Sequence, residues 1–339
     1  MKIPERILLA HGAGGRLSHE LIENLFLPAF SNPELEDLDD AAILPELPPG
    51  RLAMTTDGHV VDPPIYPGGD LGSLSVNGTV NDLVMVGAEP LYLSWALIME
   101  EGLEGELLRH YVNSARQAAA DAGVSIVAGD TKTVPRGKGD GLYAISAGIG
   151  VVPTGRRVSD RRIEVGDVIL LTGSAADHGA TIMALRHELE GPGLCSDCAS
   201  LNGLIGGLWK AGIDIHAMHD PTRGGIATTC NETASRCGLH FRLEGSEIPI
   251  APGVRAVCEI LGLDELYLAS EGRALIWLPE DQADRTLEIL HAHPQGKDAA
   301  RIGRVLPGEP DHAPVELQTV SGALRPLDLL SGMDLPRIC

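Results

Sequence analysis

The sequence predicts an α/β protein made of two domains and a tail. Its 339 residues are enough for two domains of ordinary size, each with its own core. Strand-like and helix-like segments alternate in both halves, and a stretch rich in charged and turn-forming residues, PTGRRVSDRRIEVG at 153–166, separates them. Only 3% of residues are aromatic, so we expect aliphatic cores. The expected domains are 1–155 and 156–321, followed by a flexible tail at 322–339.

Composition and charge exclude several classes of protein. The net charge of −21 disfavours nucleic acids and anionic membrane surfaces as partners, because both require a basic footprint. An acidic protein still binds nucleotides when metal ions bridge its carboxylates to phosphates. The longest mainly apolar stretch, 83–99, contains Glu89 and Pro90, so we expect no membrane span. Six cysteines without a dense pattern, and no visible secretory signal, indicate a cytoplasmic protein.

The expected elements of the first half surround a few polar motifs. A helix should follow the glycine-rich segment HGAGG, with a cap near Ser18. We expect further helices at 71–87 and 106–122 and strands at 51–57, 124–130 and 142–152.

The second half repeats this alternation. The predicted strands are 168–172 and 274–278, and the predicted helices are 178–190, 199–211, 225–237 and 281–292. From about Gly322 the sequence has little periodicity and contains Pro326 and Pro336, which indicates an extended tail.

The segment HGAGG is the first candidate binding motif. Glycine-rich loops before helices present backbone N–H groups to phosphate, which makes Gly14 and Gly15 candidates for nucleotide binding. An ordinary glycine turn explains the motif equally well. It is not a Walker loop, because no Gly-Lys-Ser/Thr follows.

Carboxylates at the ends of elements form the second candidate motif, and this motif recurs. A single aspartate at such a position is usually a cap or turn former. Four such sites in one half favour hard cations held by oxygen ligands against a triphosphate, with Lys132 adding a positive charge. The sites are DDAA at 39–42, TTD at 55–57, ND at 81–82 and GDTK at 129–132.

The second half places ionisable groups on loops, where catalytic residues are common. The segments are DHGA at 177–180, DPTRGG at 220–225 and ASEG at 269–272. Caps, turns and surface pairs are the alternative explanation for each of them. The chain also ends in a cysteine, Cys339, which is either incidental or a thiol carried on a tether.

Read together, these motifs resemble the PurM-like, AIR synthase-related superfamily of ATP-using enzymes, and within it the HypE family of hydrogenase maturation factors. The likeness extends nearly end to end, and the terminal PRIC is its most specific part. The matching segments are HGAGG, TTDGHVVDPPIYPGGD, GTVNDLVMVGAEPLYLS, GDTK, DHGA, SDCASLN, DPTRGG, ASEG and PRIC.

The resemblance implies a fold, an activity and partners. Members of the family are homodimers with an eight-stranded barrel formed across two N-terminal domains, a C-terminal α/β domain and a flexible tail. The terminal cysteine accepts a carbamoyl group from the carbamoyltransferase HypF. Mg-ATP then drives dehydration of the thiocarboxamide to a thiocyanate. The cyanide passes to iron on the HypC–HypD complex for [NiFe] hydrogenase assembly.

Matching motifs also imply roles for individual residues. Cys339 would be the acceptor, and Lys132 would stabilise the transferring phosphoryl group or orient the carbamoyl oxygen. Glu271 is the candidate base for the amide protons, and His178 is a weaker one. Mg²⁺ and phosphates would be held by Asp40, Asp57, Asp82 and Asp130, with Thr56 nearby.

Two departures and two alternatives accompany this interpretation. His219 precedes DPTRGG where relatives usually have arginine, and CSDC holds two cysteines, Cys195 and Cys198, where one is expected. Without a second CxxC or a nearby histidine pair, zinc binding there is disfavoured. The alternatives are an ATP-dependent small-molecule synthetase of the same superfamily and a non-catalytic thiol carrier or scaffold.

Overall fold

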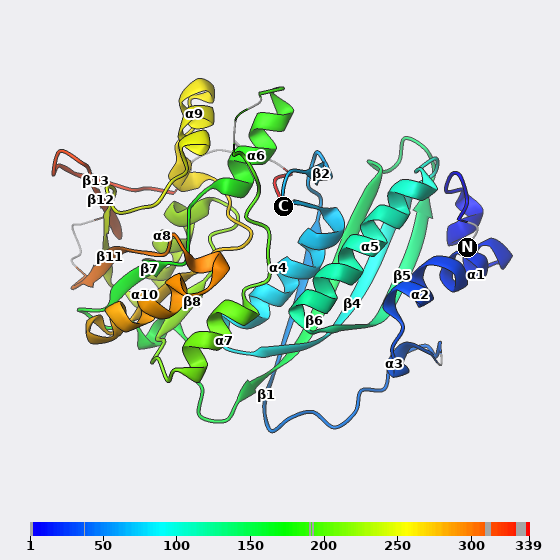
Figure 1. Cartoon of the computed structure of the whole chain (residues 1–339), viewed down its shortest axis with the longest axis horizontal. Helices are drawn as coiled ribbons and strands as arrows, with labels where there is room; N and C mark the ends of the chain where they lie inside the picture. Colours follow the sequence, from blue (N-terminus) through cyan, green and yellow to red (C-terminus); the bar gives the residue numbers. More distant parts are fainter. Residues whose placement is uncertain (1–2, 37, 190, 192, 309–312, 330–336) are drawn as a thin grey trace. The chain divides into compact units, whose positions relative to one another are not determined.

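The computed structural model describes residues 3–36, 38–189, 191, 193–308, 313–329 and 337–339. The chain divides into two compact units (Figure 1). Unit 1 consists of Met1–Ile65, Gly69–Leu83 and Ala88–Thr154, and unit 2 consists of Tyr66–Gly68, Val84–Gly87 and Gly155–Cys339. Within the described ranges, no helix is both long enough and apolar enough to cross a membrane.

Unit 1 is built on a four-stranded sheet in the order β1-β6-β4-β5. β6 is antiparallel to β1 and to β4, whereas β4 and β5 are parallel and are connected through helix α5. The strands are β1 (Gly50–His59), β4 (Glu89–Glu100), β5 (Ser125–Val134) and β6 (Leu142–Pro153). The short strands β2 (Ile65–Tyr66) and β3 (Gly69–Asp70) form a separate ladder.

Helices α4 (Leu71–Met85) and α5 (Gly105–Ala122) cover one face of this sheet (Figure 1). α5 is amphipathic and ends where Gly123 adopts the left-handed conformation, with φ of 67°, which glycine accepts without strain. The N-terminal segment adds short helices: η1 (Leu9–Gly12), α1 (Arg16–Leu21), the π-helix η2 (Ile22–Phe26), α2 (Leu27–Phe30) and α3 (Pro33–Glu36).

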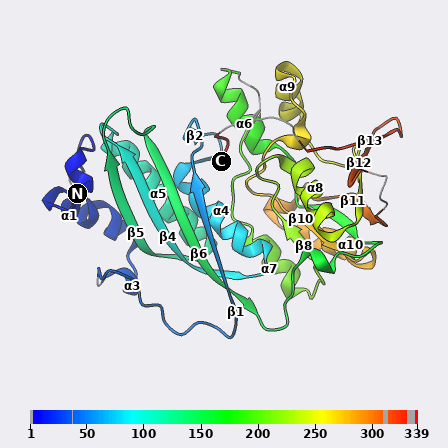
Figure 2. The same ribbon diagram turned by 180° about the vertical axis from the view of Figure 1, so that it is seen from behind.

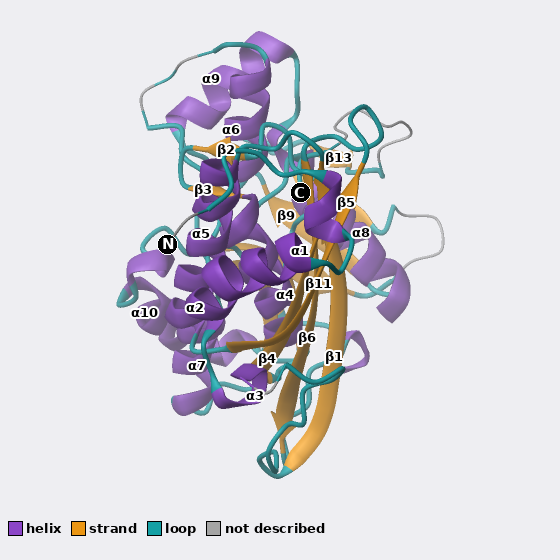
Figure 3. Ribbon diagram, turned by 90° about the vertical axis from the view of Figure 1, so that its right-hand side faces the viewer, coloured by secondary structure: helices purple, strands orange, loops and turns teal. Residues whose placement is uncertain are grey.

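The opposite face of the sheet carries no helix from the described part of unit 1 (Figure 2). Burial alternates along β4 and β6, as expected for strands covered on one side only. Leu52 and Met54 on β1 are strongly exposed, at 69% and 74%. The edge view in Figure 3 shows β1, β4 and β6 as long, twisted strands.

Unit 2 is built on a seven-stranded sheet in the order β13-β12-β9-β11-β7-β10-β8. All neighbouring pairs are antiparallel except β9 and β12. The strands are β7 (Val168–Leu171), β8 (Ala217–His219), β9 (His240–Glu244), β10 (Leu275–Leu278), β11 (Ala300–Leu306), β12 (Val315–Gln318) and β13 (Leu324–Pro326).

Every residue of β7 and β10 is buried, so both faces of this sheet are covered there. The α-helices are α6 (Asp177–Arg186), α7 (Asn202–Lys210), α8 (Gly225–Cys237), α9 (Pro252–Leu261) and α10 (Ala283–His291). Single 3₁₀ turns are η3 (Asp160–Arg162), η4 (Glu265–Tyr267), η5 (Glu280–Gln282) and η6 (Pro294–Gly296). Cys230 on α8 and Cys258 on α9 belong to the core, where burial raises the pKa of both thiols.

The structure confirms each strand and helix predicted from the sequence, with boundaries shifted by a few residues. The sequence did not predict helix α9 or the strands β2, β3, β4, β8, β9, β11, β12 and β13. β4 contains residues 89–99 of the apolar stretch that was considered only as a membrane span, because Glu89 and Pro90 at the start of the strand obscured the alternation that follows. The segment after Gly322 also differs from an extended tail: β13 pairs with β12, and Leu327 is fully buried.

The close approach of α4 and α5 yields a test of the fold. A Cβ added at Gly72 would lie 2.2 Å from the carbonyl oxygen of Tyr111, so Gly72→Ala must push the two helices apart. We expect the free energy of unfolding to fall by about 2 kcal/mol, measured from the urea midpoint. The matched control is Gly206→Ala on α7, where a Cβ meets nothing within 4 Å. This control should raise the free energy of unfolding by up to about 1 kcal/mol, because alanine favours a helix more than glycine does. An equal free energy of unfolding for the two variants would contradict the packing argument.

Candidate functional site

In unit 1 the end of β1 and the helix α4 form a carboxylate seam, defined here as Thr55, Asp57 and Asp82. Thr55 Oγ1 donates a hydrogen bond to Asp82 Oδ2 at 2.7 Å. One turn earlier on α4, a Cβ at Gly78 would lie 3.6 Å from Asp57 Oδ2 and 3.0 Å from the ring of His59. Two of the four predicted aspartates therefore lie along the same strand–helix boundary.

A buried polar network supports this seam from inside the unit. Ser146, which faces Asp57 across the β1–β6 ladder, donates its hydroxyl to the Ser75 carbonyl at 3.0 Å. His59 Nε2 lies 3.3 Å from Ser146 Oγ and 3.5 Å from Asp57 Oδ2. Trp95 Nε1 donates to Ser75 Oγ at 2.8 Å. Because unsatisfied polar groups are costly inside a protein, this network fixes β1 against α4.

Asp130 and Lys132 form a separate group, the β5 pair. Lys132 Nζ lies 2.7 Å from Asp130 Oδ1, and both side chains are more than half exposed. β5 and β1 are the two edges of the sheet, three strand spacings or about 14 Å apart. Asp130 is in register with Ala96, on the open face, whereas Asp57 points toward α4. Within one chain the structure therefore does not bring the β5 pair to the carboxylate seam.

The remaining predicted nucleotide contacts lie elsewhere in unit 1. Asp40 is exposed in the connection between α3 and β1. Thr56 donates its hydroxyl to the Ser146 carbonyl at 3.1 Å. The Gly14 N–H donates to Ser18 Oγ at 3.0 Å, so the loop uses this amide internally. Helix α1 begins at Arg16 with Gly15 as its N-cap, three residues before the cap expected near Ser18.

The donor set of the carboxylate seam fits a magnesium ion. Among the described residues, no three His, Cys, Asp or Glu side chains gather into a metal site. Magnesium in nucleotide sites is commonly held by one or two carboxylates together with substrate phosphates. Asp57 and Asp82, with the neighbouring threonine hydroxyls, meet that requirement. A site built from all four predicted aspartates stays a prediction.

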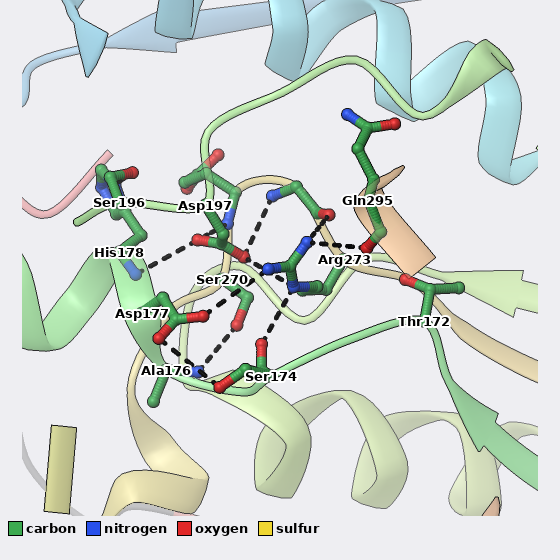
Figure 4. A network of polar contacts seen from close by, with 12 residues as sticks. Thr172, Ser174, Ala176, Asp177, His178, Ser196, Asp197, Ser270, Arg273 and Gln295 are labelled. Atoms are coloured by element: carbon green, nitrogen blue, oxygen red, sulfur yellow. Dashed lines mark hydrogen bonds and ion pairs between the residues drawn. The ribbon is translucent and has the colours of Figure 1, made fainter. Parts of the chain in front are cut away.

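In unit 2 the carboxylate of Asp197 joins three segments that lie far apart in the sequence (Figure 4). Its Oδ1 accepts the backbone N–H groups of His178 and Glu271, each at 3.1 Å. Its Oδ2 accepts the N–H of Gly272 at 3.3 Å. The side chain is fully buried. Asp197 thereby fixes the start of α6, the CSDC loop and the ASEG segment relative to one another.

Arg273 and Asp177 extend this network. Arg273 Nε lies 3.6 Å from Asp197 Oδ2, and another guanidinium nitrogen lies 3.6 Å from Asp177 Oδ2 (Figure 4). Burial, together with the negative charge of Asp197, raises the pKa of Asp177 to about 6, although Arg273 opposes the shift. Asp177 therefore changes its protonation state just below neutral pH.

His178 and Glu271, the two candidate bases, both belong to this cluster. Glu271 is buried, with 4% of its surface exposed. His178 is fully buried; its Nδ1 lies 2.8 Å from Ser196 Oγ and its Nε2 lies 2.7 Å from the Ile338 carbonyl oxygen. Burial lowers the pKa of His178, so the ring is neutral at physiological pH.

The end of the chain meets α6 in the same region. Arg186 donates a guanidinium hydrogen bond to the Arg337 carbonyl, and Ile338 is buried. Cys339 is half-buried, and residues 330–336 lie outside the described part of the chain. The last three residues therefore contact unit 2. The flexibility expected for the tail at 322–339 stays a prediction.

Sequence reasoning missed the residues that hold this cluster together. Asp197 and Ser196 lie inside the CSDC motif and the matching segment SDCASLN, but neither residue was given a role. Arg273 directly follows ASEG and was not considered. An aspartate between two small polar residues gives no sign of burial, so only the tertiary contacts identify it.

Two sequence families match the chain in succession. Residues 38–152 match the AIR synthase related protein, N-terminal domain, and residues 164–313 match the AIR synthase related protein, C-terminal domain.

Individual proteins are similar over nearly the whole chain. The chain is 47% identical to carbamoyl dehydratase HypE of Azotobacter vinelandii, over 98% of this chain and 96% of that protein. A crystal structure of hydrogenase maturation protein HypE in complex with ATP superposes with a TM-score of 0.93 at 46% identity, covering 98% and 99% of the two chains. A HypE–HypF complex contains a chain that matches with a TM-score of 0.79 at 40% identity, covering 91% and 99%.

The raised pKa of Asp177 predicts a specific dependence of stability on pH. At pH 5 the folded protein keeps the Asp177 proton, whereas the unfolded chain has lost it. The stability that Asp177 contributes is therefore complete below pH 3.8 and is lost as pH rises through about 6. Relative to Asp177→Asn, the unmodified protein should lose about 1–3 kcal/mol of unfolding free energy between pH 4 and pH 7, measured by denaturant titration.

The control for this test is Asp281→Asn, at an exposed carboxylate of η5. Its unfolding free energy should follow that of the unmodified protein at every pH. A constant difference between Asp177→Asn and the unmodified protein across the pH range would show that Asp177 titrates normally in the folded state.

Proposed function

The chain belongs to the HypE family of AIR synthase-related proteins, and we propose that it is an ATP-dependent carbamoyl dehydratase of [NiFe] hydrogenase maturation. Its substrate is a carbamoyl group carried on its own Cys339, and its product is a thiocyanate on the same sulfur. The seating of the chain end on unit 2 carries the proposal, because it holds Cys339 beside a cluster that includes Glu271. Similarity to a carbamoyl dehydratase, at 47% identity over 98% of this chain, supports it.

The reaction removes the elements of water from an amide. The carbamoyl oxygen is a poor leaving group until it carries the γ-phosphoryl group of ATP, after which it leaves as inorganic phosphate. The carbamoyl nitrogen loses both protons, and a C≡N bond remains on sulfur. The balanced products are the thiocyanate, ADP, phosphate and one proton. Phosphoryl transfer of this kind depends mainly on positioning and charge neutralisation.

Each cluster has a proposed share in this chemistry. Asp57 and Asp82 would hold Mg²⁺, which neutralises the charge of the phosphates when it is bound. Lys132 adds a positive charge for the transferring phosphoryl group or for the carbamoyl oxygen. Glu271 accepts a proton from the carbamoyl nitrogen. Asp197 binds the backbone N–H of Glu271 and so fixes the position of that residue.

A second copy of the chain would complete the nucleotide site. The β5 pair lies at the far edge of the sheet from the carboxylate seam, so one chain by itself separates groups that should act on the same phosphates. The open face, with Leu52 and Met54 exposed, offers an apolar surface for association. We propose that two copies pair through these faces, in the barrel implied by the family resemblance. The β5 pair of each copy then serves the seam of the other.

The proposed partners are the proteins that would supply the carbamoyl group and receive the cyanide. HypF would donate the carbamoyl group, which agrees with the existence of a HypE–HypF complex among the similar structures. The HypC–HypD complex would receive the cyanide on iron.

The chemical proposal is tested by following the mass of the C-terminal peptide. Endoproteinase Glu-C releases residues 317–339, in which Cys339 is the only cysteine. HypF, carbamoyl phosphate and ATP first load the carbamoyl group, and the small molecules are then removed. The group on this peptide should change to a cyano group only when Mg-ATP is added back. Cys339→Ala should abolish both adducts without loss of ATP binding, because its thiolate is the acceptor.

Two further variants separate the competing functions. Asp82→Asn and Glu271→Gln should accept the carbamoyl group normally but convert it at least about 100-fold more slowly. If Cys339 stays unmodified while the chain nevertheless consumes ATP, the chain is a small-molecule synthetase. If Asp82→Asn changes nothing and no ATP is consumed, the chain is a thiol carrier without catalytic activity.

The dimer proposal predicts that a charge on the open face disrupts association. Met54→Glu should shift the sedimentation coefficient from dimer to monomer and should lower ATP turnover, because a buried unpaired carboxylate is costly. Val320→Glu is the matched control, since Val320 is exposed on unit 2 and lies outside this face. A monomeric unmodified protein at micromolar concentration, or an unchanged Met54→Glu dimer, would refute pairing through the open face.

A further inference from the structure

The last residues of the chain are held through their main chain. His178 Nε2 lies 2.7 Å from the carbonyl oxygen of Ile338, and an Arg186 guanidinium nitrogen lies 2.5 Å from the carbonyl oxygen of Arg337. The Ile338 side chain is 6% exposed. Two consecutive carbonyls and one apolar side chain are therefore anchored immediately before Cys339.

The chemistry of the carbonyl group determines the tautomer of His178. A carbonyl oxygen only accepts hydrogen bonds, so Nε2 must carry a proton and donate it. The ring is neutral because burial lowers its pKa, so Nδ1 holds a lone pair and accepts the Ser196 hydroxyl at 2.8 Å. Ser196 Oγ in turn accepts the N–H of Cys198 at 3.1 Å. The CSDC loop thus sets the orientation in which His178 presents its N–H to the chain end.

Backbone strain indicates that the contacts position the chain end. Arg337 has a φ of 58°, in the left-handed region that a residue with a side chain rarely adopts. Such conformations persist when the surroundings impose them. Arg186 and His178 bind the carbonyls at and directly after Arg337, so these two contacts maintain the turn that leads to Cys339.

We propose that His178 and Arg186 form a carbonyl clamp, a pair of positioning residues that seat the C-terminus on α6 through the Ile338 and Arg337 carbonyls. In the reaction proposed above, on which this role rests, the clamp holds Cys339 in place during dehydration. The contacts that define the clamp are made to main-chain carbonyls, which are the same in the thiol, thiocarboxamide and thiocyanate forms, so it seats all three alike. His178 then acts by holding the main chain, and Glu271 is left as the proton acceptor.

Thiol accessibility in the resting protein tests the clamp without any substrate. The alkylation rate of Cys339 by N-ethylmaleimide is measured by mass spectrometry of the Glu-C peptide, and the exposed Cys195 serves as internal reference. His178→Phe keeps a planar ring but loses both hydrogen bonds, and Arg186→Met keeps the apolar stem. Each should raise the ratio of the Cys339 rate to the Cys195 rate about tenfold, as expected from the loss of one hydrogen bond.

Conservative and control variants separate the clamp from a merely structural role. His178→Gln retains an N–H donor near the position of Nε2 and should return the ratio to within about twofold of the unmodified protein. His187→Phe replaces an exposed histidine just after the end of α6 and should leave the ratio unchanged. Thermal unfolding of each variant shows whether it is folded, and Arg186→Met leaves the buried ring intact if His178→Phe does not fold.

A second measurement connects the clamp to the reaction. In single-turnover dehydration of the carbamoylated protein, Arg186→Met should slow formation of the cyano group about tenfold while the affinity for ATP stays the same. A ratio of alkylation rates that is unchanged in both His178→Phe and Arg186→Met overturns the clamp and leaves the proposed function standing. Failure of the unmodified protein to form the cyano group overturns the proposed function, whereas the alkylation results still decide the clamp.

Discussion

Asp197 carries a negative charge in the interior of unit 2, and a buried charge is tolerated only when neighbouring groups compensate it. Three backbone N–H groups and the guanidinium of Arg273 do so. These groups come from α6 and from the ASEG segment, while Asp197 itself belongs to the CSDC loop. The requirement to satisfy one carboxylate thus determines how three loops meet. The positions of His178 and Glu271 follow from it.

The buried negative charge of Asp197 and the groups that compensate it also affect the protonation of neighbouring side chains. Arg273 lies between Asp197 and Asp177, and it does not fully offset the burial of two nearby carboxylates. The pKa of Asp177 rises as a result. The neighbouring His178 is kept neutral by burial and donates to the chain end instead of carrying charge. One network therefore sets the protonation state, the tautomer and the seating of the terminus.

Unit 1 obeys a different constraint, which is the geometry of its sheet. A four-stranded sheet with helices on one face leaves two edges and one face open. The carboxylate seam and the β5 pair lie at opposite edges and point to opposite faces, as strand alternation requires. Chemistry that needs both groups on the same phosphates needs two chains. The exposed apolar side chains of β1 supply the surface through which they would pair.

The sequence by itself predicted the fold class and most of the local elements, because hydrophobic periodicity and glycine or proline positions act over a few residues. The family was indicated by the resemblance of its motifs. The sequence also identified six site candidates, because each of them lies in a short motif that matches the family. These candidates are Asp57, Asp82, Lys132, Glu271, His178 and Cys339. It did not reveal β4 as a strand, the strand β13 beyond Gly322, or the separation of Asp130 from Asp57. Nor did it identify Asp197 and Arg273, or the contacts of Arg337 and Ile338 with α6. Those facts depend on the order of the strands, on the face of the sheet to which each side chain points, and on contacts between residues up to 160 positions apart. Only the tertiary structure decides them.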